Sequence, residues 1–192
     1  MKITNIENFI VDAGWRPWGF VKVETDEGIT GWGECSDGRS PNGVAGTIED
    51  LKPVLIGTDP REFETRFWDM YRATRQSPGG IAAKALAGLD CAFIDIKAKS
   101  HGISVPELFG GPTRDRVRVY WSHCGSSRVR NNELIGVPPL REWDDITALG
   151  KEVVERGFTA LKTNISAGDP RCIWRGFGGG KGSTTGFVPR VS

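Results

Sequence analysis

Apolar and polar residues alternate along the first part of the chain, which is the pattern of strands with one buried face. The alternation predicts strands over residues 2–11, 20–25 and 29–35. Residues 26–28, Asp-Glu-Gly, are typical of a short hairpin loop with glycine where φ is positive. The chain is therefore predicted to open with a three-stranded antiparallel meander.

Helical spacing replaces the alternation after the third strand. One apolar run ends before Gly57 and consists of Val44, Ile48, Leu51 and Leu55. Residues 59–62, Asp-Pro-Arg-Glu, have the sequence of a capping box with proline at the first helical position. They predict a second helix that carries Phe63, Phe67, Met70 and Tyr71 on one face.

A long apolar helix is predicted from about residue 81 to residue 100, after the break at Pro78-Gly79-Gly80. Its predicted core positions are Ala82, Leu86, Leu89, Phe93 and Ile96. A further capping box at residues 104–107 predicts a short helix closed by Gly110 and Gly111. Residues 112–116 are typical of a domain boundary, which gives a first domain over 1–113 and a second over 114–192.

The second domain has a strand–helix–strand pattern. Strands are predicted over residues 117–121 and 158–162, and an amphipathic helix over 144–156 ends at Gly157. Two parallel strands joined by a helix are the start of an α/β sheet or barrel. The tail from Ser166 is rich in glycine, arginine and serine and is predicted to be loop.

Composition narrows the class of protein. The 25 basic and 24 acidic residues nearly cancel, so no nucleic-acid partner is expected. No segment has the apolar length of a membrane span or the apolar core of a signal peptide, which favours a cytoplasmic protein without membrane contact. Four widely spaced cysteines indicate neither a zinc site nor a disulfide framework.

The candidate chemistry of the second domain lies at the ends of its strands. Lys162 and Asn164 end the last predicted strand, where a barrel enzyme places its catalytic groups. His123 and Cys124 follow the preceding strand and are candidates for substrate binding; ordinary loop packing is the alternative for His123.

The first domain has its candidate in the connector of residues 12–19. Trp15, Arg16 and Trp18 could form a lid over an anionic substrate, because arginine pairs with a carboxylate through two hydrogen bonds and the indoles exclude water. Packing against the long helix is the equal alternative. Asp90 and Asp95, inside that helix, are expected to be structural, paired with Lys84, Lys97 or Lys99 or bonded to a neighbouring loop.

Four segments in order carry a family resemblance. Residues 25–34 are similar to a T-x-x-G-x-x-G-x-G-E meander, 85–99 to an A-x-x-x-x-D-x-A-L-W-D-I-x-G-K helix, 102–111 to G-x-P-x-x-x-L-L-G-G, and 157–162 to the approach to a K-x-K strand. Together they resemble the mandelate racemase/muconate lactonizing enzyme branch of the enolase superfamily, from Met1 to about Ile165.

The resemblance implies an α+β N-terminal capping domain, a three-stranded antiparallel meander plus helices, followed by the first β-α-β of an incomplete (β/α) barrel. Family members remove a proton α to a carboxylate and use Mg²⁺. Their loops corresponding to residues 12–19 and 36–46 close over the substrate. Their metal ligands, an Asp and two Glu from later strands, are absent from this chain, so no residue here is expected to bind metal.

Lys162 matches the first lysine of K-x-K, and Asn164 stands where the second lysine would be. With Asn at this position, the chain resembles the acid-sugar dehydratases, whose base is a histidine from a later strand. The leading hypothesis is an N-terminal fragment of a Mg²⁺-dependent acid-sugar dehydratase that is inactive alone, with a small carboxylate or acid-sugar substrate. The alternatives are a racemase or cycloisomerase of the same branch, or a non-catalytic capping or interaction module. A homo-oligomer is compatible with each.

Overall fold

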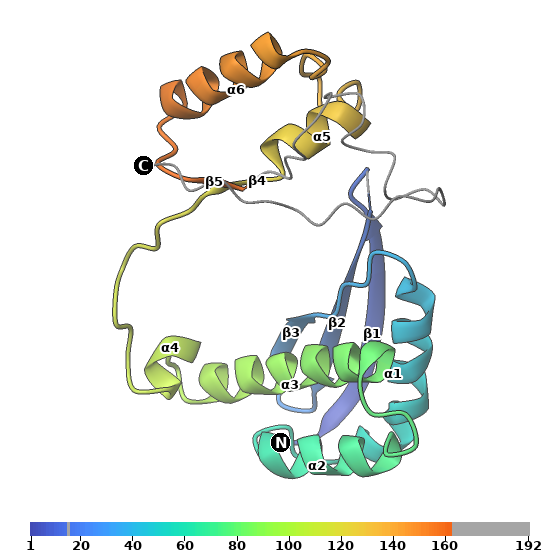
Figure 1. The fold of residues 1–192 in the computed structure, drawn as a ribbon. Helices are drawn as coiled ribbons and strands as arrows, with labels where there is room; N and C mark the ends of the chain where they lie inside the picture. Colours follow the sequence, from blue (N-terminus) through green and yellow to red (C-terminus); the bar gives the residue numbers. More distant parts are fainter. Residues whose placement is uncertain (15, 163–192) are drawn as a thin grey trace. The chain divides into compact units, whose positions relative to one another are not determined.

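The computed structural model describes residues 1–14 and 16–162 of the 192-residue chain. The chain divides into two compact units, Met1–Asp115 and Arg116–Ser192, and each is considered by itself (Figure 1). Within the described residues, no helix is both long and apolar enough to cross a membrane.

The first unit begins with the predicted meander. Strands β1 (Ile3–Asp12), β2 (Pro17–Thr25) and β3 (Thr30–Glu34) pair antiparallel in the order β1-β2-β3. Ile6 faces Val23 in the β1–β2 register, and both side chains are fully buried, as the alternation predicts. Gly28 in the second hairpin has φ of 75°, which confirms the expected turn.

Four helices follow the sheet: α1 (Pro41–Leu55), α2 (Phe63–Ala73), α3 (Gly80–Ser100) and α4 (Val105–Leu108). Helices α1 and α3 pack on the sheet, and α2 and α4 pack against α3. Figure 1 shows α3 crossing the sheet and α1 running beside β1. All the predicted core positions of α1 and α3 are buried, and the capping box of α4 is present. The spacing of apolar residues therefore predicted the buried faces of α1 and α3 correctly.

Two glycines of β3 explain the G-x-G pattern in this strand. A Cβ added at Gly31 would lie 2.1 Å from the carbonyl oxygen of Ala92, and one at Gly33 would lie 1.9 Å from that of Gly88. Real side chains cannot approach a backbone oxygen so closely. The missing Cβ atoms thus allow β3 to lie directly on the backbone of α3.

Asp95 and Lys99 of α3 bind the open edge of β3. The Asp95 carboxylate accepts from the backbone N–H of Trp32 at 3.0 Å and from the Lys99 ammonium at 2.7 Å. Lys99 also donates to the backbone carbonyl of Thr30 at 2.8 Å. The structural role predicted for Asp95 is confirmed, and the pair satisfies backbone groups that an edge strand would otherwise present to other chains.

The predicted pairing of Asp90 with a lysine or a neighbouring loop is not found among the described residues. Lys84 is engaged by Asp37, and Oδ1 of Asp90 is buried without a hydrogen-bond partner among the described residues. Burial, with a smaller contribution from the charge of Glu64, raises the pKa of Asp90.

The predicted capping box before α2 is wrong. The helix begins at Phe63, and its N-cap residue, Glu62, makes no side-chain capping bond. The Asp59 carboxylate instead accepts from the backbone N–H of Arg61 at 2.9 Å and from its guanidinium at 2.6 to 3.1 Å. A guanidinium two positions away offers charged donors, so it takes the carboxylate that the helix terminus would have used.

The second unit contains β4 (Trp121–Ser122), α5 (Cys124–Asn131), α6 (Trp143–Glu155) and β5 (Leu161–Lys162). The two strands are parallel, with Trp121 opposite Leu161, as the strand–helix–strand pattern predicts. Both are shorter than predicted, because residues 117–120 and 158–160 are not strand. Gly157 ends α6 with φ of 78°, as expected, whereas α5 was not predicted.

The core of the described second unit is small. Cys124, Leu149 and Val153 are buried, with Trp121, Leu140 and Phe158 packed against them. The Trp121 ring lies 5.5 Å from the Arg128 guanidinium and 5.0 Å from that of Arg156. Glu152 joins the two arginines at 2.6 Å and 2.8 Å. Polar contacts therefore supplement the apolar core here.

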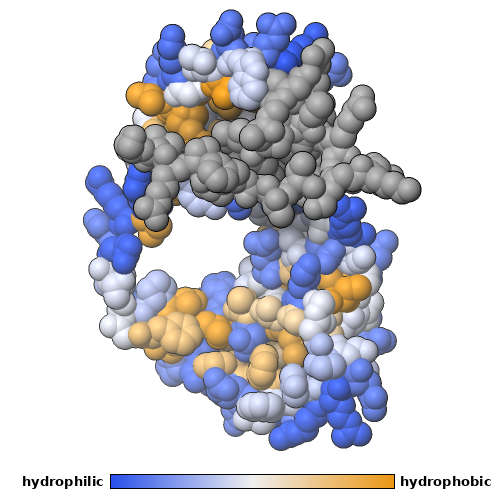
Figure 2. Space-filling model, in the orientation of Figure 1, coloured by the Kyte–Doolittle hydropathy of each residue, from blue (hydrophilic) through white to orange (hydrophobic). Residues whose placement is uncertain are grey.

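The outward side of α3 is apolar as well as the inward side. Ala83, Ala87 and Cys91 are exposed and follow one another at four-residue spacing. Figure 2 shows apolar surface where α3 and α4 are drawn in Figure 1, and Phe109 there is 65% exposed. This run gives α3 an exposed apolar strip in addition to the side that it buries in the core.

Candidate functional site

The candidate lid of the first unit is a hairpin turn of four residues. Strand β1 continues to Asp12 and β2 begins at Pro17, so only residues 13–16 connect them. The predicted loop of residues 12–19 is therefore too long. The Asp12 carboxylate accepts from the backbone N–H of Gly14 at 2.8 Å and shapes the turn. Trp15 lies outside the described residues.

Arg16 and Trp18 lie beside each other at the start of β2. Trp18 belongs to the strand, opposite Val11, and its ring centroid lies 6.3 Å from that of Phe20. The Arg16 guanidinium lies 6.0 Å from the Trp18 ring centroid, within the range of a cation–π contact. These contacts are made within the hairpin rather than with the long helix. They present a cation and an indole side by side.

Residues 36–40 form most of the connection between β3, which ends at Glu34, and α1, which begins at Pro41, and Asp37 organises this second loop. One oxygen of Asp37 accepts from the backbone N–H groups of Arg39 and Ser40 at 2.8 and 2.7 Å. Its other oxygen accepts from the Lys84 ammonium of α3. These donors, led by Lys84, lower the pKa of Asp37 to about 2.

Hydrogen bonds hold the base of the hairpin against the start of this loop. The backbone N–H of Gly19 donates to the Ser36 hydroxyl at 3.1 Å, and the backbone N–H of Cys35 donates to the Gly19 carbonyl at 2.9 Å. A Cβ at Gly38 would lie 3.8 Å from Cδ of Arg16. The turn and the loop therefore form one continuous surface, which we call the recognition surface (residues 13, 14, 16, 18 and 36–40).

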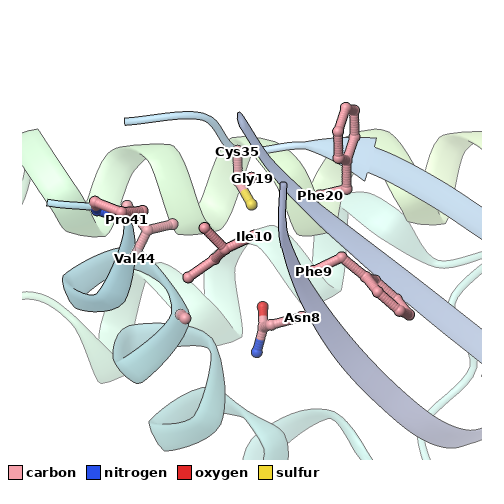
Figure 3. Close-up of a pocket in the computed structure, with 9 residues that line it drawn as sticks. Asn8, Phe9, Ile10, Gly19, Phe20, Cys35, Pro41 and Val44 are labelled. Atoms are coloured by element: carbon pink, nitrogen blue, oxygen red, sulfur yellow. The ribbon is translucent and has the colours of Figure 1, made fainter. Parts of the chain in front are cut away.

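A small hollow lies beside this surface (Figure 3). It lies between the end of β1, the start of β2 and the first turn of α1. Its lining residues are Asn8, Phe9, Ile10, Gly19, Phe20, Cys35, Pro41, Val44 and Ala45. The space open to the centre of a water molecule is about 10 Å³, which is enough for roughly one water and too little for a sugar acid.

The second unit places Lys162 where the sequence predicts it. Lys162 is exposed, is the last described residue of β5, and lies opposite Ser122 in the parallel register. Ser122 was not among the predicted site residues, because a lone serine in a sequence carries no signal. Asn164 lies outside the described residues.

His123 and Cys124 are neighbours in sequence but lie in different environments. His123 adopts the left-handed conformation (φ 57°, ψ 22°), and its Nδ1 lies 2.7 Å from the Ser122 hydroxyl. Such a conformation is uncommon for a residue with a Cβ and is found often at functional sites. Cys124 is 2% exposed and belongs to the apolar core of the unit, and burial raises the pKa of its thiol.

A metal centre does not fit the described residues. They contain no group of three or more His, Cys, Asp or Glu side chains that could hold a metal ion. The strand ends supply a hydroxyl, an imidazole and an amine (Ser122, His123 and Lys162), whereas Mg²⁺ prefers several oxygen ligands.

Comparison with known proteins identifies the family. The model of the mandelate racemase/muconate lactonizing enzyme N-terminal domain matches residues 13–110. The chain therefore belongs to this family, within the enolase superfamily. Its fold is that of the N-terminal capping domain followed by the start of the barrel.

Individual relatives agree with this placement. The chain is 40% identical over 165 residues to a D-galactonate dehydratase of Verminephrobacter eiseniae, covering 85% of this chain and 38% of that protein. A candidate L-alanine-DL-glutamate epimerase from Burkholderia xenovorans is 40% identical, with a TM-score of 0.80 over 86% of this chain and 42% of that one. A second structure of it contains magnesium and fumarate. The chain thus spans less than half the length of these relatives.

Proposed function

We propose that this chain is part of an acid-sugar dehydratase of the D-galactonate dehydratase type. The observation that carries the proposal is Lys162, which lies in β5 opposite Ser122 in a chain 40% identical to a D-galactonate dehydratase. A cation at the carboxyl end of a barrel strand is suited to a substrate carboxylate.

Dehydration of a sugar acid begins with removal of the proton α to the carboxylate, which is very weakly acidic. Positive charge beside the carboxylate stabilises the negative charge that develops on its oxygens. We assign that role to Lys162, with Ser122 as a neighbouring hydrogen-bonding group. We assign recognition of the substrate's polar chain to Arg16 and Trp18, with Trp15 as a further candidate.

The proposal includes a dependence on Mg²⁺, supported by the magnesium in the 40% identical structure. The residues described here do not fit that ion, so its ligands would have to come from another part of the polypeptide. Asn164 carries no basic group, so we propose that the general base also lies elsewhere.

A racemase or epimerase is the second candidate. The 40% identical candidate L-alanine-DL-glutamate epimerase supports it, because the same proton removal begins both reactions. The presence of Asn rather than a second Lys at position 164 favours the dehydratase, because an amide cannot return a proton to the opposite face.

A chimera tests the proposal directly. Residues 1–162 would replace the matching segment of the Verminephrobacter eiseniae D-galactonate dehydratase, with folding checked by circular dichroism. We expect loss of water from D-galactonate, and at least about a hundredfold lower kcat/KM for Lys162→Met.

Exchange of the α-proton with D₂O, followed by NMR, separates the alternatives. Exchange and inversion without loss of water would favour the epimerase. A folded chimera with neither activity would contradict the proposal and favour a non-catalytic module.

A further inference from the structure

Lys84 is remote in sequence from the recognition surface but is bonded to it. It lies in the first turns of α3 and reaches Asp37, 47 positions earlier in the chain. We propose that Lys84 is a positioning residue of the recognition surface, which holds loop 36–40 through Asp37 and thereby sets the position of Arg16. The role of Arg16 in binding a substrate rests on the proposed function. The structural coupling of Lys84 to Arg16 through loop 36–40 does not.

The first step is the contact between Lys84 and Asp37. The Asp37 side chain is 13% exposed and uses both oxygens, one for the backbone of its own loop and one for Lys84. Among the described residues, Lys84 is the one hydrogen-bonding partner of Asp37 that comes from outside the loop. Without Lys84, the loop would lose its attachment to α3, and the Asp37 carboxylate that binds the Arg39 and Ser40 amides would be held less firmly.

The second step is the contact between the loop and the turn. Gly38 immediately follows Asp37, and the Arg16 side chain passes over it, 3.8 Å from the position of a Cβ. Glycine is not needed here for a left-handed backbone, since Gly38 is not among the residues with positive φ. The Arg16 stem therefore faces the loop at position 38, where an added side chain would meet it.

The third step is the consequence for Arg16. Its guanidinium lies 6.0 Å from the Trp18 ring centroid, so a shift of loop 36–40 changes the surroundings of the Trp18 indole. Lys84 binds Asp37 of the loop, so we expect an effect of Lys84 on Trp18 to pass through the loop.

The test compares Lys84→Met with Lys84→Arg in this chain. The backbone amides of Arg39 and Ser40 are followed by hydrogen exchange, and the Trp18 indole N–H by NMR. In Lys84→Met we expect both amides to exchange roughly two- to tenfold faster and the Trp18 indole signal to shift. Lys84→Arg should restore both. Gly38→Leu, which displaces Arg16 directly, provides the reference shift for the indole.

Lys52→Met is the matched control, because it removes another surface ion pair, with Glu49 at 2.7 Å, without touching the loop. Unchanged amides in Lys84→Met, or faster amides with an unmoved indole, would overturn the proposal. If Lys84→Met does not fold, Asp37→Asn gives the same comparison, because it removes the charge that holds Lys84. No substrate is involved, so failure of the dehydratase proposal would be seen separately, in the chimera.

Discussion

The two units are built in different ways. The first unit buries a continuous core of sixteen residues between the sheet and its helices, whereas the described second unit buries three. The second unit adds a polar network in which Arg128 is 5% exposed and paired with Glu152. Apolar burial is the main source of folding free energy. The first unit therefore has the means to fold by itself, and the described second unit has far less.

The largest expected effect is at the contact between β3 and α3. Gly33→Ala places a Cβ 1.9 Å from a backbone oxygen, so strand and helix must separate. We expect a loss of at least about 3 kcal/mol in the unfolding free energy of the first unit, measured by urea denaturation. Gly46→Ala, at a helical position with open space around it, is the control and should stabilise by about 1 kcal/mol. A neutral Gly33→Ala would show that β3 does not lie on α3 as described.

The second unit should respond to loss of the charge on Glu152. Glu152→Gln leaves the buried Arg128 cation without its opposite charge, a change that costs about 3 kcal/mol in fully buried pairs. Glu152 is partly exposed, so we expect roughly 1–2 kcal/mol here. Thermal unfolding of the second unit, followed by near-UV signals of Trp121, measures the change. The conservative variant Glu152→Asp tests whether a negative charge at this position is enough to keep the stability of the second unit.

Acid should act on the same network. Burial works to raise the pKa of Glu152, but Arg128 and Arg156 hold it below its ordinary value of 4.5. The folded state then binds fewer protons than the unfolded state, so this contribution is complete above pH 4.5 and is lost as the pH falls through the folded pKa. We expect the second unit to lose stability in that range, and Glu152→Gln to remove this part of the pH dependence. An unchanged pH profile in Glu152→Gln would contradict the network.

A smaller effect is expected at the sheet edge. Asp95→Ala removes the acceptor of the Trp32 N–H and the partner of Lys99. A loss of about 1 kcal/mol is expected for one net hydrogen bond of this kind, together with more self-association, because an edge strand becomes available. Denaturation and size-exclusion chromatography measure the two effects, with Asp69→Ala, a surface carboxylate on α2, as control. An Asp95→Ala variant with unchanged stability and size would show that the edge needs no cap.

The smallest effect is expected from Mg²⁺. The described strand ends bring together Ser122, His123 and Lys162 but no carboxylate, so titration calorimetry of this chain should show no micromolar binding. Stoichiometric micromolar binding would reveal oxygen ligands that the account lacks.

Local patterns in the sequence predicted most of the first unit. Val44 to Leu55 and the apolar face of α3 follow one helical period, and both became core. Features that depend on distant residues were missed. The G-x-G of β3 has its cause in Gly88 and Ala92, more than fifty residues later. The capping box at Asp59 failed because a side chain two positions away competed for the same carboxylate.

The candidate site was predicted less completely than the fold. The parallel pairing of the Lys162 strand with the strand before His123 follows from the β-α-β pattern and is as predicted. Asp37 and Lys84 carry no motif, and only the packing of α3 against the loop brings them together. Helix α5 was missed because Gly-Ser-Ser-Arg has no apolar period. Contacts with other elements stabilise this helix, because Arg128 packs against the Trp121 ring and forms an ion pair with Glu152.

Hydrogen exchange of the intact chain tests the contrast between the units most directly. The amides of residues 85–98 in α3 should be protected to the level of global unfolding of the first unit. The amides of β4, α6 and β5 should exchange much faster, because the buried apolar core of the described second unit consists of just Cys124, Leu149 and Val153. Equal protection of α3 and α6 in the monomer would contradict the account.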